Sequence, residues 1–168
     1  MIDIRGNMFS DNWSGVTLWE NADRFCNSPA NTSGLSCTPL VPSVSSCVQP
    51  GIASAPLYDD CRWKTQRVYV RENTFEFDSH TPGCLSLCGR MAVLSNYGTF
   101  PTWSPYKGTV ISEAITFRQD NRWYDNKYYG PWTFVAQDAS RALSIDQWLA
   151  APYNQDTCST FGESAGCD

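Results

Sequence analysis

The clearest pattern in the sequence is a short alternation of apolar and polar residues that occurs three times. The three copies span residues 2–9, 68–75 and 115–123, and each contains two apolar residues two positions apart, then arginine, asparagine and an aromatic residue. An alternation with a period of two places the apolar side chains on one face of a β-strand. Asparagine tolerates the left-handed backbone conformation, so we expect bends and a ladder of amide hydrogen bonds at Asn7, Asn73 and Asn121.

A second alternating segment follows each copy, at residues 15–20, 91–96 and 131–136. We expect each segment to form a further strand. The residues expected to face inward are Val16, Leu18, Ala92, Leu94, Trp132 and Phe134. Those expected to face outward are Thr17, Trp19, Val93, Ser95, Thr133 and Val135. Each repeat thus supplies three short strands, and stacked repeats would bury a continuous apolar column, as in solenoid proteins.

The spacing between the repeats predicts a single domain with long insertions. We assign residues 1–138 to the repeats, with inserted loops at 26–63, 80–89 and 97–108, and residues 139–168 to a C-terminal cap and tail. Ser144 and Gln147 have the spacing of a capping box, which predicts a short helix that ends before Pro152. We expect Ile145, Trp148 and Leu149 to cover the open end of the last repeat, because solenoids need such terminal caps.

The eight cysteines indicate disulfides rather than a metal centre. They are Cys26, Cys37, Cys47, Cys61, Cys84, Cys88, Cys158 and Cys167. The sequence has no Cys-x-x-Cys pair and only one histidine, His80, whereas zinc sites use closely spaced cysteines and histidines. Disulfides persist in oxidising compartments, so we expect a secreted or cell-surface protein. Residues 1–7 do not have the pattern of a signal peptide, and we therefore expect the leader to lie elsewhere.

Charge and hydropathy exclude two classes of partner. The formal net charge is −5, with 12 lysines and arginines and no basic run, which is the opposite of what a nucleic-acid phosphate backbone requires. No stretch approaches the roughly 18 consecutive apolar residues of a membrane-spanning helix. We therefore expect neither nucleic-acid binding nor a membrane span.

Three segments of the chain resemble secreted right-handed parallel β-helix proteins of the pectate-lyase-like superfamily, including uncharacterised actinobacterial β-helix repeat proteins. They are IDIRGNMFSDNWSGVTLWENADRFC, ITFRQDNRWYDNKYYGPWTFVAQD and LSIDQWLAAPYNQD, the last similar to a W-x7-D ending of such helices. The resemblance implies an all-β fold, a right-handed parallel β-helix of about three rungs with long disulfide-stapled loops and a short capping helix. It is poorly specific for activity, because one fold hosts many functions.

Members of that superfamily have many more rungs than three, so we expect the first repeat of this chain to be an uncovered rung. An uncovered rung offers unpaired strand edges to another chain. We expect either end-to-end self-association through the open N-terminal rung or a cover formed by the 26–63 loop.

Enzymes of the superfamily carry carboxylates and a basic residue on one strand ladder, where they hold Ca²⁺ or act as acid and base. The outward residues of the 15–20, 91–96 and 131–136 segments carry no charge, which argues against catalysis there. The remaining acid–base candidates are Glu20 and Asp138 at the strand ends. Asp11, Asp78 and Asp125 could gather a Ca²⁺ ion, or could simply build turns. We expect no other cofactor.

Arginines and aromatic residues supply the candidate binding groups. Arg5, Arg71 and Arg118 would form a column that clamps uronate or phosphate groups, unless Asp3, Glu72 and Asp120 neutralise it. Exposed aromatic rings, among them Trp19 and Tyr97, could stack on sugars or pack loops against the strands. The leading hypothesis is non-catalytic recognition of an extracellular polysaccharide. The alternatives are a polysaccharide lyase or glycoside hydrolase acting at a loop-walled groove, and a structural or adhesive stacking module.

Overall fold

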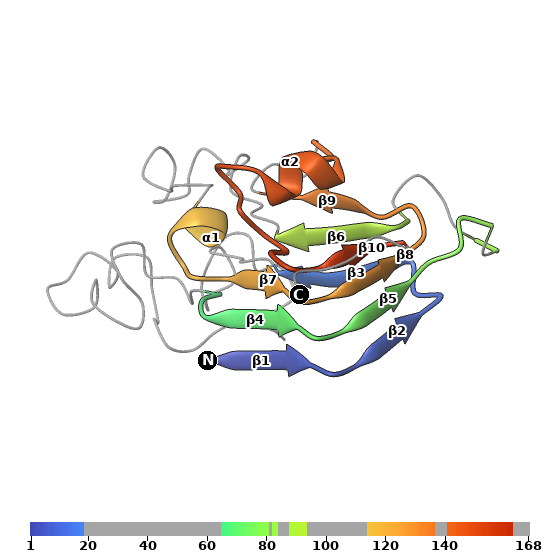
Figure 1. Cartoon of the computed structure of the whole chain (residues 1–168), viewed down its shortest axis with the longest axis horizontal. Helices are drawn as coiled ribbons and strands as arrows, with labels where there is room; N and C mark the ends of the chain where they lie inside the picture. The colour runs from blue at the N-terminus through green and yellow to red at the C-terminus, as the bar shows by residue number, and fades with distance from the viewer. Residues whose placement is uncertain (19–64, 81, 84–87, 94–113, 137–140, 163–168) are drawn as a thin grey trace, which may run out of the picture. The chain divides into compact units, whose positions relative to one another are not determined.

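The computed structural model describes residues 1–18, 65–80, 82–83, 88–93, 114–136 and 141–162, all within one compact unit. Most of the regular structure in this part of the chain consists of short β-strands in parallel sheets, and the two helices are four and five residues long (Figure 1). The all-β expectation is confirmed at this level. No described helix is long and apolar enough to cross a membrane.

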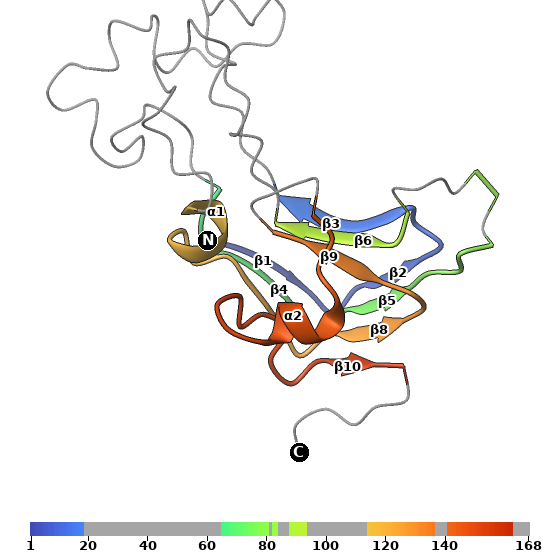
Figure 2. The same ribbon diagram turned by 90° about the horizontal axis from the view of Figure 1, so that it is seen from above.

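The strands form three parallel sheets, and each sheet takes one strand from each sequence repeat. The first sheet has the order β1 (Ile2–Arg5), β4 (Val68–Arg71), β7 (Arg122–Tyr124). The second has the order β10 (Thr160–Phe161), β8 (Lys127–Tyr129), β5 (Thr74–Glu76), β2 (Met8–Ser10). The third has the order β3 (Ser14–Leu18), β6 (Arg90–Val93), β9 (Thr133–Val135). The predicted three strands per repeat are therefore present, and equivalent strands lie side by side (Figures 1 and 2).

The third repeat begins later than the sequence pattern predicted. Ala114–Phe117 forms a short helix, α1, and not the expected strand. The strand that pairs with β4 is β7, in which Trp123 lies beside Val70 and Tyr124 beside Arg71. The placement of Arg118 in a column with Arg71 is consequently wrong. Alternation over three residues at 115–117 was too short to distinguish a strand from one turn of helix, because both place some apolar residues inward.

Each bend between the first and second sheets has a residue in the left-handed conformation directly before an asparagine. These residues are Gly6, Glu72 and Asp125, with φ of 67°, 55° and 55°. The asparagine side chain then joins neighbouring repeats. Oδ1 of Asn73 accepts from the backbone N–H of Asn7 at 3.0 Å, and Oδ1 of Asn126 accepts from that of Asn73 at 3.0 Å. The predicted ladder is confirmed for Asn7 and Asn73, but its third member is Asn126 and not Asn121.

Aromatic rings stack next to this ladder in the core. Phe9, Phe75, Tyr128 and Phe161 lie in one column, with successive centroid distances of 4.9, 5.2 and 4.9 Å and interplanar angles of 12° or less. Each ring comes from the same position of a different strand of the second sheet. Phe75 is buried in the core and Phe9 packs against it, whereas Trp123, the aromatic residue of the third sequence copy, is buried one strand earlier, on β7 of the first sheet.

Residues 156–161 form a partial fourth repeat that the sequence pattern did not reveal. Thr157 bridges to Tyr124, and Thr160 and Phe161 pair with Lys127 and Tyr128. Ser159 takes the ladder position, where its Oγ accepts from the backbone N–H of Asn126 at 2.8 Å. Because serine replaces asparagine, this repeat does not match the asparagine pattern of the other three. Its strand β10 nevertheless lies beside β8 and extends the second sheet (Figure 2).

The third sheet follows a different alternation from the predicted one. The buried residues of β6 are Met91 and Val93, one position before the expected inward pair, and Val135 of β9 is also buried. The register between β3 and β6 shifts between Ser14 and Thr17, as at a β-bulge. The prediction that Val93 faces outward is wrong, because the extra residue of β3 brings Leu18, and not Thr17, beside Val93. Trp132, just before β9, and Phe134 face the core as predicted, and Val135 is buried without being part of the core cluster.

The helix α2 (Ile145–Leu149) caps the last repeat as predicted. Both hydrogen bonds of the Ser144–Gln147 capping box are present. Trp148 is fully buried, and its ring stacks on Phe134 at 5.0 Å between centroids. Ile145 also packs against the core as expected, whereas Leu149 was expected in the same interface but is 38% exposed.

Candidate functional site

The outer face of the first sheet carries the charged and aromatic side chains that the stack leaves accessible. Val68 and Val70 of β4 point into the core, so Tyr69 and Arg71 point away from it. In register, Asp3, Tyr69 and Arg122 form one row across the three strands. Arg5, Arg71 and Tyr124 form the next row.

Arg71 lies in the middle of this face, and acidic residues surround it. Its Nε and Nη2 donate to the two carboxylate oxygens of Asp3 at 3.0 and 2.8 Å, and Nη1 pairs with Glu72. The bond to Arg71 lowers the pKa of the Asp3 carboxyl, and the bond to Asp3 raises the pKa of Arg71. Its guanidinium also lies 6.0 Å from the ring centre of Tyr124. These pairs support the alternative in which acids neutralise the arginines.

A second cluster at the edge of the same face centres on Asp120. The Tyr69 hydroxyl donates to Oδ2 of Asp120 at 2.7 Å, and Nε of Arg122 donates to Oδ1 at 2.8 Å. The bond from Arg122, followed by that from Tyr69, lowers the pKa of the Asp120 carboxyl, and the bond to Asp120 raises the pKa of Tyr69. Asp120 therefore stays ionised and holds the Arg122 side chain in a fixed direction.

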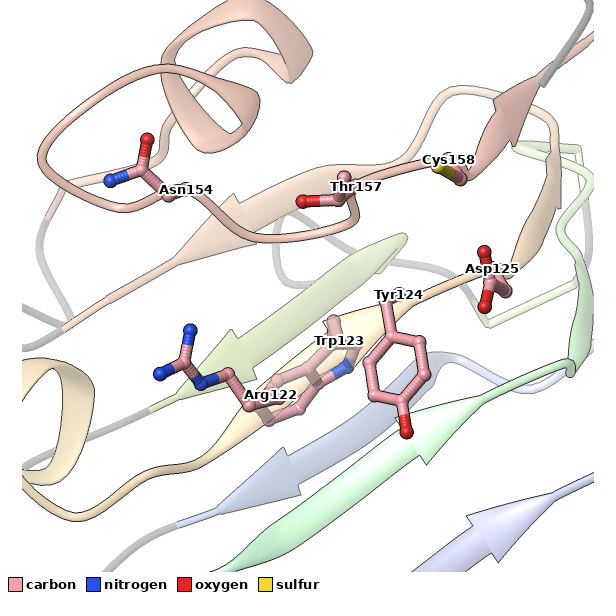
Figure 3. A pocket seen from close by; sticks show the side chains of 7 residues that line it. All are labelled: Arg122, Trp123, Tyr124, Asp125, Asn154, Thr157 and Cys158. Carbon is pink, nitrogen blue, oxygen red and sulfur yellow. The ribbon is translucent and has the colours of Figure 1, made fainter. Parts of the chain in front are cut away.

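A cavity of about 330 Å³ opens beside this cluster, between β7 and the chain after α2 (Figure 3). Its lining residues are Arg122, Trp123, Tyr124, Asp125, Asn154, Thr157 and Cys158. A smaller cavity of about 120 Å³ adjoins it and shares Arg122 and Asn154. One wall therefore comes from β7, and the other from residues 154–158.

Asp156 holds that second wall in place from behind. Its buried carboxylate accepts hydrogen bonds from Nε1 of Trp148 at 2.6 Å, the Tyr128 hydroxyl at 2.9 Å, Oγ of Ser159 at 2.7 Å and Nδ2 of Asn126 at 3.0 Å. These donors come from α2, β8, the partial fourth repeat and the asparagine ladder. Asp156 thus joins the cap to the stack and positions Thr157 and Cys158 at the cavity.

The ionisation of Asp156 leads to a prediction about pH. Burial raises the pKa of the Asp156 carboxyl, although its four donors act in the opposite direction. A carboxyl whose pKa is higher in the folded chain than in the unfolded chain stabilises the fold at a pH below its unfolded-state pKa, which is about 4. This stabilisation is lost as the pH rises through the folded-state pKa. We therefore expect the parent chain to lose stability relative to Asp156→Asn as the pH rises from about 3 towards neutrality. Urea unfolding of both chains across this range measures the difference, and a relative gain by the parent would contradict it.

Most of the sequence-predicted site residues lie outside the described residues. These are Trp19, Glu20, Tyr97, Asp138 and the cysteines Cys26, Cys37, Cys47, Cys61, Cys84 and Cys167. Cys88 and Cys158 are each disulfide-bonded.

The structure does not bring the three candidate calcium ligands together. Asp125 lies at the bend after β7, Asp11 follows β2, and Asp78 follows β5. Asp11 and Asp125 both have positive φ, and Asp78 accepts from the backbone N–H of His80, which fits their alternative role as turn residues. Among the described residues, no group of three or more acidic, cysteine or histidine side chains is placed to hold a metal ion.

Sequence reasoning missed several residues of this site. Arg122, Asn154 and Asp156 were not candidates, because the third repeat was placed six residues too early to bring Tyr124 beside Arg71 and the fourth was not recognised. The W-x7-D ending was a usable signal, since it contains the Trp148–Asp156 hydrogen bond. The chain matches no protein-family model, no curated protein and no solved structure.

Proposed function

We propose that this unit is a stack of right-handed parallel β-helix rungs from a secreted protein, with disulfides stapling its loops, and that it recognises an extracellular polysaccharide. The β-helix assignment is supported by the three parallel sheets that share one strand per repeat, and by the asparagine ladder at the bends. Stacked aromatic rings from equivalent positions support it further.

The cavity between β7 and residues 154–158 is the observation that carries the binding function. Its volume of about 330 Å³ falls in the range of small-ligand sites, which combine apolar surface with a few placed polar groups. Tyr124 offers an aromatic ring, while Arg122 and Asn154 offer donors and Asp125 an acceptor. Sugars present apolar ring faces together with many hydroxyl groups, so this mixture of side chains fits a glycan better than a purely apolar ligand.

Replacing Tyr124 with alanine should weaken polysaccharide binding about tenfold, since truncating an anchoring aromatic side chain in a binding site costs more than about 1 kcal/mol. Affinity electrophoresis through gels containing pectin, alginate or a neutral glucan measures the effect. The matched control is Tyr129→Ala, because Tyr129 is 42% exposed on β8, away from the cavity. Equal retention of the two variants would contradict the assignment of the site.

The same polysaccharides also separate binding from catalysis. A non-catalytic binder leaves their chain length unchanged after long incubation. Release of unsaturated products would instead identify a lyase, and new reducing ends without unsaturation would identify a hydrolase.

A further inference from the structure

We infer that the cavity beside β7 is one half of an extended site that takes a glycan carrying anionic groups, with its carboxylate or sulfate bound by Arg122. The inference rests on the proposed function and deepens it. It follows from three features of the site: two adjoining cavities, an aromatic side chain lining each, and a guanidinium that lines both.

The two cavities are adjacent, because two residues line both of them. Arg122 from β7 and Asn154 from the segment after α2 line both the 330 Å³ and the 120 Å³ cavity. Figure 3 shows these two side chains on opposite walls, at the end of the larger cavity away from Asp125. A linear ligand can therefore pass from one cavity to the other across the Arg122–Asn154 boundary.

Each cavity has its own aromatic group. Tyr124 lines the larger cavity, and Phe117 lines the smaller one together with Tyr153. Phe117 is 39% exposed, although it is a large apolar side chain, and its ring centre lies 5.6 Å from that of Tyr153. Two aromatic platforms on either side of a polar boundary suit two neighbouring sugar residues of one chain.

Arg122 supplies the charge selectivity. Its side chain is 58% exposed, and its Nε donates a hydrogen bond to Asp120 at 2.8 Å. A guanidinium has further donors at its terminal nitrogens, in a planar arrangement that matches a carboxylate or sulfate. Asp120 fixes the direction of this group in advance, which reduces the entropy lost on binding. Asp125 at the far end of the larger cavity can accept from sugar hydroxyls.

Isothermal titration of the full chain with defined oligosaccharides tests the inference. The probes are galacturonate oligomers of one to four residues, sulfated galactan oligomers of matched length, and neutral glucose oligomers. We expect the affinity for one of the anionic series to rise at least tenfold from the monomer to the dimer or trimer and then to level off. We expect the neutral series to bind at least tenfold more weakly, as the loss of a hydrogen-bonded charge pair predicts.

Three variants locate the effects. Arg122→Gln should remove the preference for anionic oligomers, whereas Arg122→Lys should retain only part of it, because lysine lacks the planar pair of donors. Phe117→Ala should reduce trimer affinity to the level of the monomer without changing monomer affinity. Arg5→Gln is the matched control, since Arg5 is exposed on the same sheet but on β1, two strands from β7.

The outcomes separate this inference from the proposed function. Binding that depends on Tyr124 but is equal for neutral and anionic oligomers would keep the proposed function and overturn the assignment of Arg122. Equal affinity for monomer and trimer, unaffected by Phe117→Ala, would overturn the second subsite. Absence of binding to any glycan would overturn the proposed function as well.

Discussion

Replacing Asp156 with alanine is expected to lower the free energy of unfolding by about 4 kcal/mol, because removing one partner of a buried charged network leaves several polar groups uncompensated. The side chains that lose their acceptor belong to Trp148, Tyr128, Asn126 and Ser159. Asp156 also has φ of 52°, which is unfavourable for alanine. Chemical unfolding monitored by tryptophan fluorescence measures the loss.

A matched control separates the hydrogen-bond network from the backbone conformation. Asp125 also has positive φ, 55°, but it is exposed. Asp125→Ala should therefore cost only the roughly 1 kcal/mol of placing alanine in the left-handed region. Equal losses in the two variants would show that the network of Asp156 adds nothing. Because Asp156 positions the segment 154–158, Asp156→Ala should also weaken glycan binding under conditions where the chain remains folded.

Replacing Gly130 with alanine is expected to cost more than about 3 kcal/mol, since the new methyl group would overlap with backbone in addition to adopting an unfavourable φ. Gly130 has φ of 101°, and a Cβ there would lie 2.0 Å from the carbonyl oxygen of Phe77. Phe77 donates its backbone N–H to Tyr129 at 2.9 Å, so neither segment can move away without breaking the stack. The midpoint of urea unfolding should fall accordingly.

Gly6 provides the comparison for this second prediction. It also has positive φ, 67°, but an added Cβ would meet no atom within 4 Å. Gly6→Ala should therefore cost only about 1 kcal/mol, the conformational part of the effect. If both alanine variants were equally stable, the close approach between Gly130 and Phe77 would not limit the packing of adjacent repeats.

Part of the fold could be predicted because it depends on residues close together in sequence. The alternation at residues 2–9 and 68–75 was sufficient to identify the strands, the bends and the asparagine pair of the first two repeats. The capping box at Ser144 was equally local, and its two hydrogen bonds are present. In each case the pattern depends on a few consecutive residues, so it can be recognised without knowing which other segments of the chain lie beside them.

Most of the candidate site could not be predicted from such local patterns. Arg71 was identified, but its neighbour across the sheet is Tyr124 and not Arg118. The third member of the expected arginine column is therefore an aromatic ring, while Arg5 remains beside Arg71. Asn154 and Thr157 entered the site only through the segment after α2, which leads into a partial repeat in which serine replaces asparagine.

The sequence by itself determined that this chain forms short parallel strands in a repeating unit with an asparagine ladder and a helical cap. Only the tertiary structure decided which residue of one repeat lies beside which residue of the next, and hence that Arg122, Tyr124 and Asn154 share a cavity. Side-chain alternation fixes which face a residue occupies, but it is nearly unchanged when a repeat moves along the chain by two residues. The register is fixed instead by the fit of whole repeats, through the stacked rings, the asparagine hydrogen bonds and the buried carboxylate of Asp156.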